Sequence, residues 1–129
     1  MDLLRKKIVI LSLGSIINTA SGKEEQEDIT DFRIRKEILD KLNTIKGLSR
    51  VVVIHGLNEK EFLPMLKALE FFIFVYCKTA VSCMASCDGL MDSLPHNLRR
   101  KDVILSVGSN EASELLNSDY VTKEDFLSL

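Results

Sequence analysis

Several features that would place this chain in a special class of protein are scarce or missing. Cysteine occurs only three times, so Cys77, Cys83 and Cys87 cannot all pair, and reduced thiols are expected. Their spacing with His96 matches none of the usual zinc-binding pairs, so no metal is expected. Charge is nearly balanced, with 17 lysine and arginine residues against 19 aspartate and glutamate residues and a formal net charge of −2. This balance implies no global attraction to nucleic acid or to an anionic membrane.

Long apolar runs are missing as well. The stretch from Ile8 to Ile17 is interrupted by serine and glycine, and it lacks the cleavage pattern of a signal peptide. The stretch from Phe71 to Val81 contains Lys78 and is shorter than the roughly 20 residues that a spanning helix requires. We therefore expect no membrane association and an intracellular, soluble protein, cytoplasmic or nuclear.

The composition is that of a globular protein. With 129 residues, of which 46% are hydrophobic and 28% charged, the chain is long enough to bury a useful core. It contains no internal repeat and no break in composition. Residues 1–129 are therefore expected to form a single domain.

Short apolar runs predict the strands of a sheet. The runs from Ile8 to Leu13, from Val51 to Ile54 and from Val103 to Val107 are nearly continuous and consist mostly of β-branched residues and leucine. Such runs are typical of strands buried on both faces, so we expect these three to be adjacent central strands of one parallel sheet. Asp119 to Val121 is expected to be a brief last strand.

Two longer helices are expected between the strands. The first follows Asp31, which can cap it, and ends before Gly47. Its apolar positions recur at helical spacing: Ile34, Ile38, Leu42 and Ile45. The second begins within two residues of Glu61, so that Pro64 falls in its first turn. The run from Phe71 to Cys77 is either a further strand or the apolar end of this helix, and the region from Lys78 to Leu94 has no clear assignment.

The end of the chain repeats the alternation of strand and helix. Glu111 to Leu116 predicts a short helix, and Thr122 with Asp125 resembles a capping box for a terminal helical turn. Strands that alternate with helices through short links indicate a parallel sheet with right-handed crossovers. The predicted fold is therefore α/β, a three-layer Rossmann-like sandwich with a central parallel sheet.

A family resemblance is carried by several segments in order. The first predicted strand leads through Ser12 to the small residues Gly14 and Ser15. The segments that follow are Ser21-Gly22-Lys23, Asp31-Phe32-Arg33-Ile34 and the closing stretch from Asp119 to Phe126. Together they resemble the polynucleotide kinase 3′-phosphatase branch of the haloacid-dehalogenase-like superfamily. The resemblance covers most of the chain.

This resemblance implies magnesium-dependent phosphatase chemistry at the end of the first strand, where an aspartate attacks the phosphate. Ser12 stands at the nucleophile position, and the acid/base aspartate has no counterpart beside Gly14. His55 replaces the threonine or serine that holds the phosphate. Ser109 and Ser113 stand where aspartates would bind magnesium.

The lysine motif of the family is replaced as well, by Met84, Ala85 and Ser86. A serine without a neighbouring base is a poor nucleophile, and magnesium requires charged oxygen ligands that these positions lack. The resemblance therefore implies no catalytic residue, no metal and no cofactor.

Three functions follow as alternatives. The first is a catalytically inactive phosphatase-like domain, a pseudoenzyme that acts as a structural, self-assembling or binding module. The second is a polynucleotide 3′-phosphatase-type phosphate monoester hydrolase with a rearranged site, such as Ser12 with His55. The third is a nucleic-acid-binding remnant. The candidates for phosphate or nucleic-acid contacts are Ser15, Lys23, Arg33, Arg99, Arg100 and Lys101.

The sequence also predicts self-association. The region between Lys78 and Leu94 is short, so apolar side chains near it are expected to lack full cover. These side chains are Phe71, Phe72, Phe74, Val81 and Met84. A homo-oligomer would cover them, whereas the sequence names no other protein partner.

Overall fold

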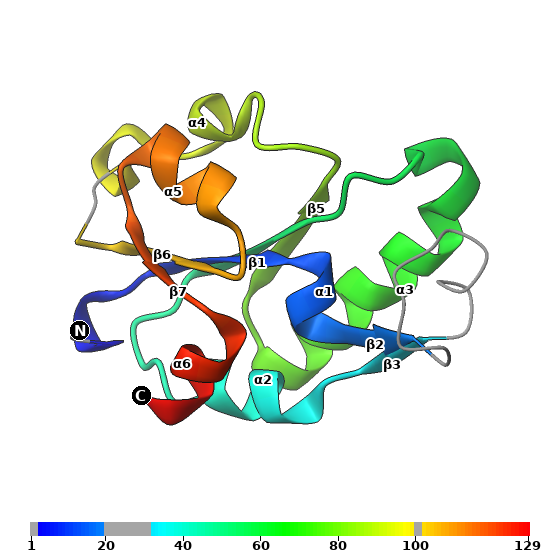
Figure 1. Cartoon of the computed structure of the whole chain (residues 1–129), viewed down its shortest axis with the longest axis horizontal. Coiled ribbons are helices and arrows are strands. Elements are labelled where there is room, and N and C mark those ends of the chain that lie inside the picture. The colour runs from blue at the N-terminus through cyan, green and yellow to red at the C-terminus, as the bar shows by residue number, and fades with distance from the viewer. Residues whose placement is uncertain (1–2, 20–31, 100–101) are drawn as a thin grey trace.

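The computed structural model describes residues 3–19, 32–99 and 102–129. Its centre is a sheet of five parallel strands in the order β5-β4-β1-β6-β7 (Figure 1). These strands are β1 (Ile8–Ser12), β4 (Arg50–Ile54), β5 (Ala80–Met84), β6 (Ile104–Val107) and β7 (Asp119–Val121). The three runs expected as adjacent central strands form β4, β1 and β6, so this prediction is confirmed.

The central strands are apolar because both faces of the sheet are covered. Ile8 to Leu11 in β1 are fully buried, and Leu11 lies in register between Val53 of β4 and Val107 of β6. Branched apolar side chains pack well on a pleated surface of this kind. Because successive side chains in a strand point to opposite faces, β1 contributes to two cores, one on each side of the sheet.

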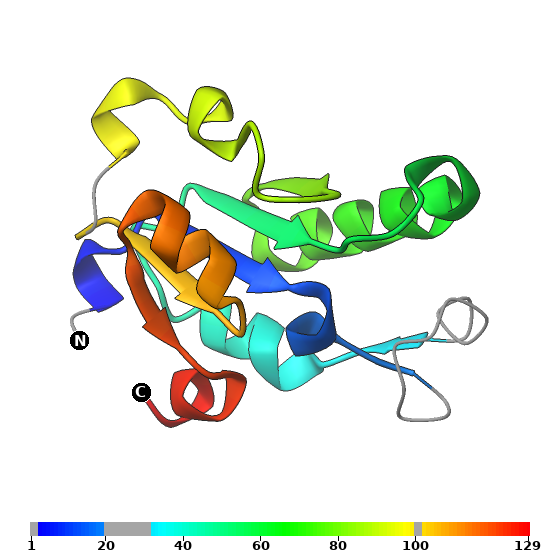
Figure 2. The same ribbon diagram turned by 45° about the horizontal axis from the view of Figure 1, so that its top comes forward.

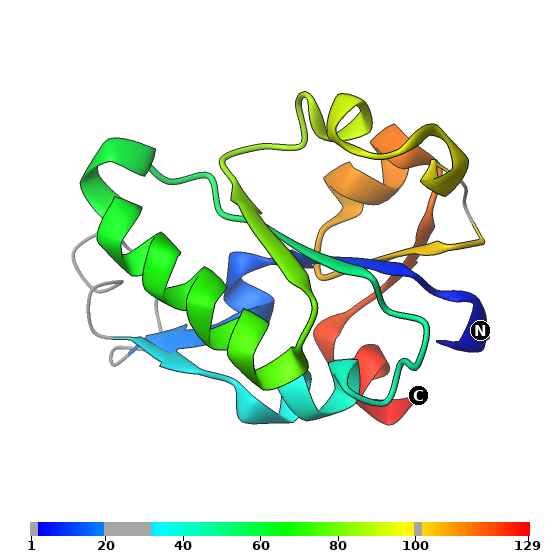
Figure 3. The ribbon, with the colours of Figure 1, turned by 180° about the vertical axis from the view of Figure 1, so that it is seen from behind.

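Helices form the outer layers (Figures 2 and 3). One face of the sheet packs against α2 (Lys36–Leu42), α3 (Glu59–Cys77) and α6 (Lys123–Ser128). The opposite face packs against α4 (Leu90–Ser93) and α5 (Asn110–Leu116). The predicted α/β sandwich with a central parallel sheet is therefore confirmed.

A small hairpin follows the first strand and corrects one prediction. After β1 the chain forms the one-turn helix α1 (Leu13–Ile16) and then an antiparallel pair, β2 (Ile17–Thr19) with β3 (Phe32–Ile34). Ile34, expected inside a helix, is paired with Ile17 in this hairpin. Helix α2 begins only at Lys36, because the backbone of the preceding residues is taken up by the strand pairing. The expected cap, Asp31, lies outside the described residues.

The run from Phe71 to Cys77 belongs to α3, so its interpretation as a strand is wrong and its interpretation as a helical extension is right. The buried stripe of the helix continues through this run, with Leu69 and Ile73 fully buried. Lys78 then ends the helix in the left-handed conformation, with φ of 54°. The unassigned region contains the edge strand β5, whose residues are only partly buried and therefore carry a weak apolar signal.

The start of α3 is set by a cap. The side chain of Asn58 accepts hydrogen bonds from the backbone N–H groups of Lys60 and Glu61, at 3.0 and 3.3 Å. Because the helix begins at Glu59, Pro64 lies beyond its first turn and not inside it as predicted. The helix tolerates this proline at the loss of one backbone hydrogen bond.

The carboxyl-terminal part follows the predictions closely. Helix α5 and strand β7 lie where they were expected, and Thr122 caps α6 by accepting a hydrogen bond from the N–H of Asp125 at 3.1 Å. Two 3₁₀ turns, η1 (Leu3–Arg5) and η2 (His96–Leu98), complete the described elements. Across the described ranges, none of the helices combines the length and apolar character that a membrane crossing requires.

Candidate functional site

The candidate site lies at the carboxyl edge of the parallel sheet, which is the edge where open α/β sheets bind ligands. A cavity of about 460 Å³ opens there. Its lining comes from the ends of four strands and includes Ser12 after β1, His55 after β4, Ser86 after β5 and Gly108 after β6. The strand order thus gathers residues that are far apart in the sequence.

Two serine hydroxyls occupy the centre of this edge. Ser12 ends β1, and Ser15 lies one turn later in α1, so both side chains leave the backbone on the same side. Their Oγ atoms are 2.7 Å apart and form a hydrogen bond. Ser15 is buried and Ser12 is partly buried. The position expected for a nucleophilic carboxylate therefore holds a pair of neutral hydroxyls joined by one hydrogen bond.

The backbone of Gly108 lies directly against this hydroxyl pair. A Cβ atom at Gly108 would come within 2.1 Å of the Ser15 Oγ and 2.6 Å of the Ser12 Oγ. Gly108 also has a φ of 77°, which side chains rarely adopt. This glycine is therefore required both by its conformation and by the close approach of the two serines.

Substitution at Gly108 tests this packing. We expect Gly108→Ala to lower the free energy of unfolding by about 2 kcal/mol or more, because it adds a steric clash to an unfavourable backbone conformation. Gly89→Ala is the matched control, since Gly89 has the same φ of 77° but has no atom within 4 Å of its added Cβ. Urea unfolding measures both. Equal losses in the two variants would show that the serine pair does not crowd Gly108.

His55 lines the cavity, and one nitrogen of its ring is already engaged in a hydrogen bond. The backbone N–H of Leu57 donates to the Nδ1 atom of His55 at 3.1 Å. In the neutral ring the proton therefore lies on Nε2. The loops that follow β4 and β5 are also joined, because the N–H groups of His55 and Gly56 donate to the carbonyls of Met84 and Ala85, each at 2.9 Å. These bonds hold the imidazole at the edge of the sheet.

Glu111 is a lining residue that sequence reasoning missed. It lies in the first turn of α5 and is the one carboxylate among the described residues of the cavity wall. Burial raises the pKa of the nearby Cys87 thiol, and the charges of Glu111 and Asp88 raise it further. The signal in the sequence was weak, since Glu111 reads as an ordinary acidic residue at a helix start.

The two serines expected at the metal-binding positions do not line the cavity. Ser109 precedes α5 at its N-cap, where its side chain makes no capping hydrogen bond. Ser113 donates from its Oγ to the carbonyl of Asn110 at 2.8 Å, within the same helix. Of these three residues at the start of α5, only Glu111 lines the cavity.

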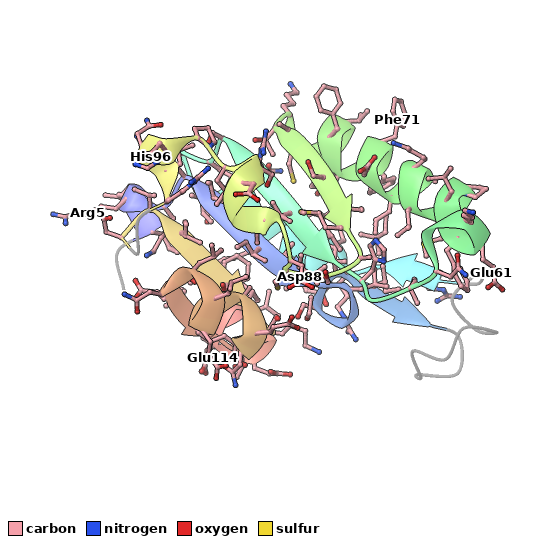
Figure 4. The ribbon with its side chains drawn as sticks, turned by 90° about the horizontal axis from the view of Figure 1, so that it is seen from above. Arg5, Glu61, Phe71, Asp88, His96 and Glu114 are labelled. Carbon is pink, nitrogen blue, oxygen red and sulfur yellow. The ribbon has the colours of Figure 1, made fainter. Side chains whose placement is uncertain are left out.

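The two described basic residues among those proposed for phosphate or nucleic-acid contacts, Arg33 and Arg99, do not line the cavity. Arg33 lies in the hairpin strand β3, beside a separate hollow against α3. Arg99 follows η2, and its Nε donates to the carbonyl of Leu94 at 3.1 Å. Figure 4, in which His96 marks η2, shows that η2 and β3 lie at opposite ends of the molecule. Lys23, Arg100 and Lys101 lie outside the described residues.

The cysteines are poor candidates for nucleophiles. Burial, with a smaller effect from Asp40, raises the pKa of Cys77 to about 11, so its thiol stays protonated at neutral pH. Cys83 is partly buried beside α3 and does not line the cavity. Within residues 3–19, 32–99 and 102–129, no three histidine, cysteine, aspartate or glutamate side chains are grouped so as to hold a metal ion.

The site therefore offers hydrogen bonds and little charge. The residues that line the cavity include two serines, Ser12 and Ser86, together with His55 and Glu111, and the other described lining residues are glycine, alanine, leucine and isoleucine. Such a set can orient a polar ligand, but it contains no activated nucleophile. Comparisons of the chain with protein-family models, with curated proteins and with solved structures give no match.

Proposed function

We propose that this protein is a catalytically inactive phosphatase-like domain that acts by binding and not by turnover. The observation that carries this proposal is the hydrogen-bonded pair of Ser12 and Ser15 at the carboxyl end of the central strand, 2.7 Å apart and packed against Gly108. A phosphatase of the resembled kind needs a carboxylate there. The neutral pair fills that space and is joined by one hydrogen bond.

The surroundings of the pair support the same proposal. Metal-dependent phosphoryl transfer needs several negative ligands to hold magnesium and orient the phosphate. Among the described lining residues, Glu111 alone carries a carboxylate. Its single charge, without basic lining residues around it, also disfavours a phosphate group in the same cavity.

The alternative of a rearranged hydrolase is less well supported by the geometry. A serine nucleophile needs a base within hydrogen-bond reach. The Nδ1 atom of His55 already accepts from Leu57, which leaves the proton on Nε2. The Ser12 hydroxyl is instead hydrogen-bonded to Ser15. Neither contact activates Ser12 for attack.

The proposal predicts an absence of phosphatase activity. In millimolar magnesium, the protein should hydrolyse neither an aryl phosphate nor an oligonucleotide 3′-phosphate above the rate of the buffer. Magnesium should also leave the melting temperature unchanged, because an ion that binds the folded state would raise it. Phosphate release and thermal unfolding are the two measurements.

A specific contrary result would point to the rearranged hydrolase. If the protein releases phosphate, Ser12→Ala and His55→Ala separate true turnover from a contaminating enzyme. Ser113→Ala is the matched control, since Ser113 bonds within its own helix and lies outside the cavity wall. Activity that Ser12→Ala or His55→Ala abolishes and Ser113→Ala preserves would overturn the proposal.

A further inference from the structure

The outer side of α3 carries most of the large apolar side chains that are exposed among the described residues. Its second half, from Phe71 to Cys77, is apolar all the way round, and a helix of this kind is normally buried on every side. The inner side packs on the sheet through Leu69 and Ile73. On the outer side Phe71 is 69% exposed and Phe74 is 53% exposed. Figure 4 shows Phe71 pointing away from the sheet.

These exposed side chains form one continuous stripe. Leu63, Lys67, Phe71 and Phe74 follow each other at intervals of three or four residues, which places them along one face of the helix. Val75 adjoins them, and both Leu63 and Val75 are about half exposed. We call Leu63, Phe71, Phe74 and Val75 the α3 stripe. Isolated apolar residues on a surface are common, but a connected set of this size marks a contact site.

The charge of Lys67, which lies between the apolar side chains, is matched within the chain. Lys67 lies between Leu63 and Phe71 on the same face of the helix, and its Nζ atom is 3.5 Å from the Oε2 atom of Glu70. Glu70 in turn accepts a hydrogen bond from the backbone N–H of Cys83 at 2.9 Å. This contact blocks part of the open edge of β5 against the addition of another strand. A partner would therefore contact this side through side chains and not through strand pairing.

We propose that the α3 stripe is the interface of a homodimer in which two α3 helices pack across a two-fold axis. A two-fold interface must be self-complementary, so the same surface has to present both a ridge and a hollow. The phenylalanines form the ridge. Beside them, a hollow of about 350 Å³ is lined by Lys67, Glu70, Phe71, Phe74 and Val81. The ridge of one copy fits the hollow of the other.

The exposed apolar area of the stripe is about half of what a standard dimer interface buries per partner. The four side chains of the stripe expose on the order of 400 Å², judged from the areas that large apolar side chains bury. A standard interface buries about 800 Å² per partner. The stripe supplies the apolar centre of that area, and Lys67, Val81 and the neighbouring turns supply its rim. Because Lys67 is neutralised by Glu70, a second copy brings no unmatched charge to the centre.

This inference deepens the proposed function, on which its biological meaning rests, by naming a second copy of the chain as the partner. The two ideas fail separately, since turnover is measured by phosphate release and association by mass. An active dimer would overturn the first alone. An inactive monomer would overturn the second alone.

Sedimentation equilibrium of the full chain over a wide range of concentrations tests the interface. The unmodified protein should be a dimer that dissociates on dilution. Phe71→Glu and Phe74→Glu should each raise the dimer dissociation constant by on the order of 100-fold or more, because a two-fold interface carries each change twice. Both positions are exposed in the monomer, so circular dichroism should show unchanged folding.

Leu115→Glu is the matched control, because Leu115 is 49% exposed and lies in α5, on the opposite face of the sheet. It should leave the dissociation constant unchanged. A protein that is monomeric at every concentration would overturn the proposal, and so would a dimer that survives both phenylalanine substitutions. A monomer whose stripe binds vesicles of phosphatidylcholine and phosphatidylserine would overturn it in favour of a lipid surface.

Discussion

Val53→Asp is expected to lower the free energy of unfolding by about 4 kcal/mol or more, the largest effect of a single substitution that we predict. Val53 is fully buried in β4, between Leu11 of β1 and Cys83 of β5. An aspartate there would be desolvated without a charged partner. Since small domains are stable by only about 5–15 kcal/mol, this loss is a large fraction of the total stability.

Two further variants show whether the cost comes from the charge. Val53→Ala removes apolar contacts alone and should cost about 2 kcal/mol. Leu115→Asp places the same charge on an exposed helix position and should have little effect. Urea unfolding followed by circular dichroism measures all three. If Val53→Asp unfolds at the same urea concentration as Val53→Ala, β4 is not the dry central strand described here.

Asp119→Ala is expected to cost about 3 kcal/mol, because it removes the carboxylate from a buried lysine. Lys6 is only 2% exposed, and its Nζ atom lies 2.7 Å from the Asp119 Oδ2. The same Nζ atom lies 3.4 Å from the carbonyl of Ile104. This contact ties the segment before the central strand β1 to the outer strand β7. Breaking this contact should weaken the attachment of β7 to the rest of the sheet.

A double-mutant cycle separates the buried charge from the lost contact. Lys6→Met in the Asp119→Ala background removes the buried charge that has lost the Asp119 carboxylate, so the double variant should be more stable than Asp119→Ala alone. Lys67→Met is the matched control, since the ion pair of Lys67 with Glu70 is exposed and should contribute little. Additive losses from Lys6→Met and Asp119→Ala would contradict the coupling expected from the distance between the two groups.

Together, the two proposals describe a phosphatase-like domain that associates with a second copy of itself and does not hydrolyse phosphate. In it, the carboxyl edge of the sheet keeps its cavity but has neutral hydroxyls at the centre, while α3 carries the contact surface. The two features lie on different elements. Substitutions at Phe71 should therefore leave the cavity intact, and substitutions at Ser12 should leave the association unchanged.

The sequence by itself determined the class of fold and its centre. The runs that form β1, β4 and β6 are short, mostly apolar and rich in β-branched residues, and such runs are typical of strands covered on both faces. The same holds for the Thr122 cap, because a cap depends on residues only three positions apart. Such local rules can be applied without knowing which segments meet.

The tertiary structure decided whatever depends on more than one segment. Phe71 to Cys77 is apolar at every position, so its sequence has no period, and packing of Ile73 against the core selects the helix. Ile34 fits a helical spacing, yet pairing with Ile17 makes it a strand residue. In each case a distant partner provides the hydrogen bonds or the buried surface that the local pattern leaves open.

The candidate site was likewise predictable from the sequence only in part. Ser12 and His55 could be named from the sequence because each directly follows a predicted buried strand, and parallel strands end at one edge. Glu111 entered the cavity wall, and Ser109 and Ser113 stayed out of it, because the turn at Gly108 sets how α5 meets the sheet. The contact of Gly108 with the serine pair joins β6 to β1. That contact depends on strand order, which the crossovers fix and which no single stretch of the sequence contains.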